Sequence, residues 1–185
     1  MDDAPLLATA SQFLSLALIM QGRFLEAQLH LSRTRSLLSY LDHDLQRIST
    51  QSAAALCQMV QGDCLAGLAA DDALITQLID KGQHELARLP EVLHVVALAL
   101  SGDIDATQRH AQQVLPQAEQ SASPLLLYPL YSLLAWSHAS HGDSTQALAC
   151  QAQAQLHAQA SASRMLSGAW LDATHADTLQ RRGQL

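Results

Sequence analysis

The glycines of this chain recur at an almost constant interval. Gly22, Gly62, Gly102, Gly142 and Gly183 are separated by 40, 40, 40 and 41 residues. Self-similarity with a period of a few tens of residues is typical of repeat proteins, in which each supersecondary unit buries its apolar face by stacking on the next unit. The period therefore predicts a repeat protein that works by binding.

The sequence around each glycine predicts a tight turn between two helices. Glycine adopts the left-handed conformation that commonly ends a helix. Three of the five glycines are followed by aspartate, which can cap the next helix: Asp63, Asp103 and Asp143. A small residue follows four or five positions after the glycine, where we expect two helix backbones to approach closely: Ala27, Ala66 with Gly67, Ala106 and Ala147.

The glycines and the apolar periodicity between them predict nine helices. Their expected ranges are 5–20, 23–40, 44–61, 63–80, 84–101, 103–119, 125–140, 143–160 and 162–181. Pro90 and Pro129 fall inside two of these patterns, where each either kinks a helix or begins one. No segment is typical of a strand.

These elements predict an all-α fold, a right-handed superhelical solenoid of antiparallel helix pairs with tetratricopeptide-like repeats of about 40 residues. Residues 1–185 would form a single domain of about four and a half pairs. The sequence after Gly183 begins a turn whose second helix is missing, so we expect a fragment of a larger protein, or self-association through the uncapped C-terminal repeat.

Composition argues against several classes of function. The chain has 17 acidic residues against 10 Lys and Arg, a formal net charge of −7, and its arginines are dispersed, so we expect no direct contact with nucleic acid. The apolar segment 5–20 is short for a membrane span and lacks a basic leader, which favours a cytoplasmic protein without membrane contact. Three cysteines without a CxxC pair favour reduced thiols.

No sequence motif points to catalysis or to a cofactor. The chain lacks a phosphate-binding loop, a GxSxG elbow and an HExxH zinc motif, so we expect neither an enzyme nor a bound cofactor. His138 and His141 have a spacing that could hold a metal, but histidine near a helix C-terminus is more simply explained by the helix dipole, and we expect no metal site. The pair Asp71 and Asp72 is interpreted as part of an exposed helix face.

Two segments carry a resemblance to a known family. VLHVVALALSGDIDATQRHAQQVLP (residues 92–116) and LLAWSHASHGDSTQALACQAQAQLHAQA (residues 133–160), followed by ADTLQRRGQL, resemble the tetratricopeptide-like region of MalT-like, LuxR-family bacterial transcriptional activators. The resemblance implies a parent chain with a preceding ATP-binding switch module and a following helix-turn-helix module. In that setting the helical repeats would sense a small-molecule effector or a regulatory protein.

Stacked helix pairs form a groove, and a few residues are candidates to line it. Five residues stand at a fixed distance before a turn glycine, and we expect them to point the same way: Leu16, Val96, Trp136 and Asp177 at six positions before it, and Met59 at three. Four of the seven aromatic residues fall in the fourth pair and the helix after it: Tyr128, Tyr131, Trp136 and Trp170. These rings either grip a ligand or partner in the groove or fill gaps in the core.

The predicted contact residues are therefore Met59, Tyr128, Tyr131, Trp136, Trp170 and Asp177. The function we expect is effector sensing or protein interaction in a MalT-like, LuxR-type regulator. A stand-alone tetratricopeptide-like adaptor or chaperone that binds a partner peptide is the alternative.

Overall fold

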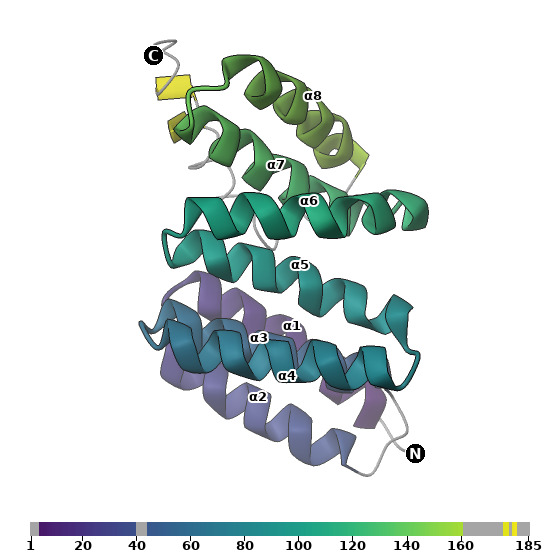
Figure 1. Ribbon diagram of the computed structural model, residues 1–185. Helices are drawn as coiled ribbons and strands as arrows, with labels where there is room; N and C mark the ends of the chain where they lie inside the picture. Colours follow the sequence, from purple (N-terminus) through teal and green to yellow (C-terminus); the bar gives the residue numbers. More distant parts are fainter. Residues whose placement is uncertain (1–3, 40–43, 161–175, 178, 181–185) are drawn as a thin grey trace. The chain divides into compact units, whose positions relative to one another are not determined.

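A computed structural model describes residues 4–39, 44–160, 176, 177, 179 and 180. Over these residues the chain forms eight α-helices and no strand, so the predicted all-α class is confirmed (Figure 1). The helices are α1 (Ala4–Met20), α2 (Phe24–Leu38), α3 (Asp44–Val60), α4 (Cys64–Asp80), α5 (His84–Leu100), α6 (Ile104–Ser121), α7 (Pro124–Ser140) and α8 (Ser144–Ala160). The ninth expected helix, 162–181, lies almost entirely outside the described residues.

The predicted turn chemistry is confirmed. Gly22, Gly62, Gly102 and Gly142 all have positive φ, between 72° and 99°. At Gly142 the turn is closed by two backbone hydrogen bonds, from the Gly142 N–H to Ala139 (3.0 Å) and from the Asp143 N–H to His138 (2.9 Å). This double closure is the Schellman motif, which satisfies carbonyls that the helix end leaves open.

The aspartate after the glycine caps the next helix in all three places where it occurs. Asp103 Oδ1 accepts from the Ala106 N–H at 2.8 Å, Asp143 Oδ1 from the Gln146 N–H at 3.1 Å, and Asp63 Oδ1 from the Ala66 N–H at 3.4 Å. Each carboxylate satisfies an amide that has no partner within the helix and also faces the positive end of the helix dipole. Helix starts were therefore predictable from short-range sequence.

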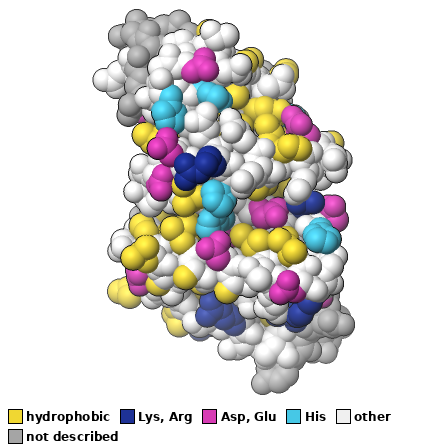
Figure 2. Space-filling model, in the orientation of Figure 1, with side chains coloured by type: hydrophobic (Ala, Val, Ile, Leu, Met, Phe, Trp, Pro, Cys, Tyr) yellow, Lys and Arg dark blue, Asp and Glu magenta, His cyan; other side chains and the backbone are white. Residues whose placement is uncertain are grey.

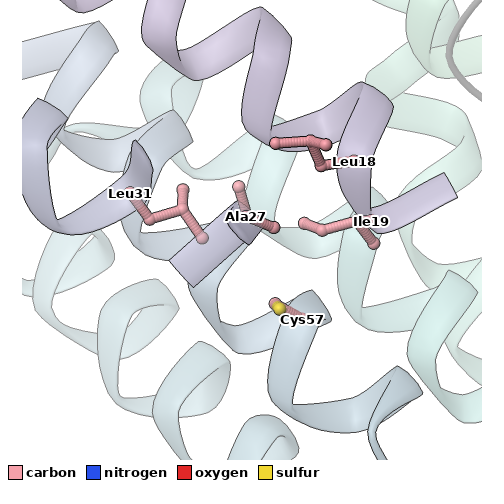
Figure 3. Packing of buried hydrophobic residues seen from close by; sticks show 6 residues of the cluster. Leu18, Ile19, Ala27, Leu31 and Cys57 are labelled. Carbon is pink, nitrogen blue, oxygen red and sulfur yellow. The ribbon is translucent and has the colours of Figure 1, made fainter. Parts of the chain in front are cut away.

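The chain divides into two compact units, Met1–Ala97 and Leu98–Leu185, which are described separately. In the first unit α2 packs on α1, α4 packs on α3, and α3 also contacts α1 and α2. Side chains from three helices converge in its core: Leu18 and Ile19 from α1, Ala27 and Leu31 from α2, and Cys57 from α3 (Figure 3).

At Gly67 the helices α3 and α4 approach each other closely. A Cβ at this position would lie 2.7 Å from the carbonyl oxygen of Ala55 and 2.2 Å from Cγ of Met59. No real Cβ makes contacts that short, so only glycine fits between the two helices. The small residue expected after the turn is thus required here by packing.

In the second unit α7 lies between α6 and α8 and packs against both. Its central residues Leu130 and Leu133 are completely buried. The helix continues through Pro129, as α5 continues through Pro90, so neither proline begins a helix. Both prolines are buried.

Candidate functional site

Tyr131 links α6, α7 and α8. It projects from α7 and its hydroxyl donates a hydrogen bond to Oε1 of Glu119 on α6, at 2.5 Å. Its ring stacks on the imidazole of His157 on α8, with 5.8 Å between ring centroids and 6° between planes. The ring is half-buried, so it is held in place while part of it still faces solvent.

The surroundings of Tyr131 keep its hydroxyl protonated. Burial, together with the hydrogen bond to the Glu119 carboxylate, raises the pKa of Tyr131 to about 12. At neutral pH this phenol is therefore a hydrogen-bond donor and an aromatic surface, and it is not a base or a nucleophile.

Trp136 and Asp177, two of the predicted contact residues, are brought together. The indole Nε1–H of Trp136 donates to Oδ2 of Asp177 at 2.9 Å. Trp136 stands six residues before Gly142 and Asp177 six residues before Gly183, so the bond joins equivalent positions of successive sequence repeats. Both side chains are half-buried. The hydrogen bond fixes the orientation of the largest aromatic ring on α7.

Two further predicted contact residues, Tyr128 and Met59, are buried. Tyr128 is only 6% exposed and packs against Ala154 of α8. Of the two alternatives that the sequence left open for the aromatic residues, Tyr128 follows the one in which the ring fills a gap in the core. Met59 is 2% exposed and fills the space beside Gly67, so it lies in the core of the first unit and not on a groove surface. Met59 also precedes Gly62 by only three residues, unlike Trp136. Trp170 lies outside the described residues.

The two histidines at the end of α7 engage different partners. His141 Nε2 lies 2.8 Å from Oδ1 of Asp105, whereas His138 Nδ1 lies 3.3 Å from Nε2 of Gln108. Across the described part of the chain, no three metal-ligating side chains come together. The arrangement fits histidines that tie α7 to α6.

Asp71 was misinterpreted from sequence. It was expected on an exposed face with Asp72, but its side chain is completely buried, whereas that of Asp72 is two-thirds exposed. Burial raises the pKa of Asp71 from 3.8 to about 7, against an opposing contribution from the Ser52 hydroxyl. Ser52 is also buried, although the two side chains lack the geometry of a full hydrogen bond.

The burial of Asp71 recurs at the equivalent position of the other repeats. Asp71 stands nine residues after its turn glycine, the position that Leu31, Ala111 and Gln151 occupy in the other repeats. All three of those residues are buried. The position is therefore buried in all four repeats, but two of its four residues are polar, so the sequence alignment alone does not mark it as core.

On the face that Figure 2 shows, Lys and Arg side chains are scattered among acidic and histidine side chains. None of the eight helices is both long and apolar enough to span a bilayer. Comparison of the chain with protein-family models, curated proteins and solved structures gives no match.

Proposed function

We propose that this chain is a helical-repeat binding module whose helix pairs stack as a right-handed, tetratricopeptide-like solenoid. Support comes from the four equivalent turns and from burial that recurs at the repeat interval. Ala27, Thr107 and Ala147, each five residues after a turn glycine, are all 0% exposed. Solenoids present a continuous concave surface, and binding is their usual role.

The binding surface we propose centres on Trp136. Its indole N–H donates to Asp177, and its half-buried side chain remains partly exposed to solvent. Tyr131, five residues earlier on α7, is a second aromatic side chain that is held in place, by Glu119 and His157. Fixed aromatic rings bind at low entropic cost because little side-chain freedom is lost on association.

The biological role we propose is effector sensing in a MalT-like, LuxR-type transcriptional activator. The sequence resemblance supports this role, and the acidic surface is compatible with a segment that leaves DNA binding to another module. A ligand that binds one arrangement of the helices more tightly than another would shift the equilibrium between the two arrangements of the parent protein. The size of the shift is set by the difference between the two binding affinities.

Native mass spectrometry of the purified chain after exposure to bacterial metabolites tests this proposal. We expect the chain to retain a small molecule. In the Trp170→Phe variant Trp136 is the one tryptophan left, so binding of that molecule should change the tryptophan fluorescence of this variant. Trp136→Phe should weaken binding at least tenfold without a large change in melting temperature. The Trp170→Phe variant is the matched control.

Two outcomes would contradict the proposed site or role. Equal affinity of the Trp136→Phe variant and the unaltered chain would remove Trp136 from the site. A retained protein or peptide, with no small-molecule adduct, would favour the adaptor function over effector sensing.

A further inference from the structure

The first helix carries an apolar face that no described residue covers. Four of its large side chains are strongly exposed: Leu6 (69%), Leu7 (55%), Phe13 (56%) and Leu14 (45%). Ala10 and Ala17, which lie on the same face, are exposed as well. Contiguous exposed apolar surface of this kind is uncommon on monomers and marks an interaction site.

The equivalent face of later helices is a packing surface. At the 40-residue interval, positions 10 and 13 of α1 correspond to Thr50 and Ala53 of α3 and to Leu130 and Leu133 of α7. These four residues are at most 1% exposed. Ala53 packs in the core beside side chains of α1 and α2. In this architecture the face receives another helix, so the surface on α1 has the form of an interface.

We infer that this face of α1 is a self-association surface, on which α1 of a second copy of the chain packs in antiparallel orientation. Leu7, Ala10, Leu14 and Ala17 are spaced by three, four and three residues, the spacing of a coiled-coil seam. When two such helices run antiparallel about residue 12, Leu7 lies opposite Ala17 of the other copy and Leu14 lies opposite Ala10.

This pairing is self-complementary in shape. Each leucine meets an alanine in every layer of the seam, which lets the two helices approach closely without leaving a cavity. A twofold axis repeats each contact, as in the isologous dimers that are the commonest protein oligomers. Leu6 and Phe13 flank the seam on one side and add apolar surface to it.

The lack of charge on this face permits a second copy as the occupant. The chain carries a formal net charge of −7, which opposes self-association through charged surfaces. Residues 4–20 contain no Asp, Glu, Lys, Arg or His. The α1 face is therefore a long apolar surface that two identical acidic chains can bring together without placing like charges in contact.

Sedimentation velocity of the full chain tests the inference. Between about 1 and about 200 µM, a range that spans the weaker end of specific interfaces, we expect a monomer that converts to a dimer. Leu14→Glu should raise the dissociation constant at least tenfold, because it places two carboxylates in the seam. Leu25→Glu is the matched control, since Leu25 is 82% exposed on α2, and it should leave association unchanged.

A charge-swap variant tests the antiparallel order. Adding Ala10→Lys to Leu14→Glu in the same chain places each lysine opposite a glutamate of the other copy, so association should recover at least threefold at low salt relative to Leu14→Glu alone. A chain that stays monomeric up to 200 µM would overturn the inference, as would equal effects of Leu14→Glu and Leu25→Glu. Failure of the charge swap to restore association would overturn the antiparallel arrangement.

Discussion

Replacement of Gly67 by alanine tests the packing of α3 on α4. The added Cβ would lie 2.7 Å from the Ala55 carbonyl oxygen, about 0.7 Å below the 3.4 Å at which ordinary contact begins. The Met59 side chain can move away from its 2.2 Å contact, but a backbone carbonyl cannot move unless its helix does. The two helices must therefore separate.

Two opposing effects set the size of the loss. Overpacking a close helix contact costs roughly 1–3 kcal/mol, and the involvement of backbone places this site at the upper end. Alanine regains about 1 kcal/mol because glycine is a poor helix former. We expect a net loss of about 2 kcal/mol in the free energy of unfolding, or roughly 4–8 °C in melting temperature for a chain of this size.

Urea unfolding followed by circular dichroism at 222 nm measures this loss. Ala66→Ser, at the exposed neighbouring position, is the control and should cost less than about 1 kcal/mol, because it changes helix propensity alone. The double variant Gly67→Ala/Met59→Ala removes the contact with the Met59 side chain, but the clash with the Ala55 carbonyl oxygen remains. The stability losses of the two single variants should therefore not add up in the double variant. If Gly67→Ala stabilised the protein, the close approach of the two helices would be refuted.

Four further substitutions test the helix ends and the buried carboxyl group. Asp103→Ala should cost about 1 kcal/mol in urea unfolding and Asp63→Ala less, because their cap bonds measure 2.8 and 3.4 Å; equal losses would contradict this order. Ala122→Gly should raise stability by about 1 kcal/mol, since Ala122 has φ 50° at the end of α6; a fall in melting temperature would refute the strain. For Asp71 the folded pKa lies above the unfolded one, so its contribution to stability is lost as pH rises from about 4 to about 7. As pH rises from 4 to 8, the free energy of unfolding of Asp71→Asn should increase by a few kcal/mol relative to that of the unaltered chain. If the unfolding free energies of the two proteins changed in parallel with pH, an effect of this carboxyl group would be excluded.

The boundaries of the helices were predictable because neighbouring residues determine them. The expected helix 125–140 is observed as Pro124–Ser140, and 63–80 as Cys64–Asp80. Glycine selects the left-handed turn and aspartate satisfies the first free amides, whatever packs on the helix later. The end of α6 was predicted less well, at residue 119, whereas the helix runs to Ser121. Its C-cap is Ala122, and an alanine does not signal the left-handed conformation that ends the helix there.

The candidate site was only partly predictable. Trp136 and Asp177 share a place in the repeat, and their hydrogen bond agrees with that register. The stacking of Tyr131 on His157 depends on how α7 and α8 pack, which no local pattern contains.

The sequence by itself determined where the helices begin, where they turn and which positions recur. Only the tertiary structure decided which side of each helix is buried. Asp71 has the polarity of a surface residue but lies in the core, and Met59 fills the space beside Gly67. Conversely, Leu14 has the character of a core residue but lies on the surface. The physical reason is that turn and cap interactions join residues close in the chain, whereas burial depends on helices that are distant in sequence.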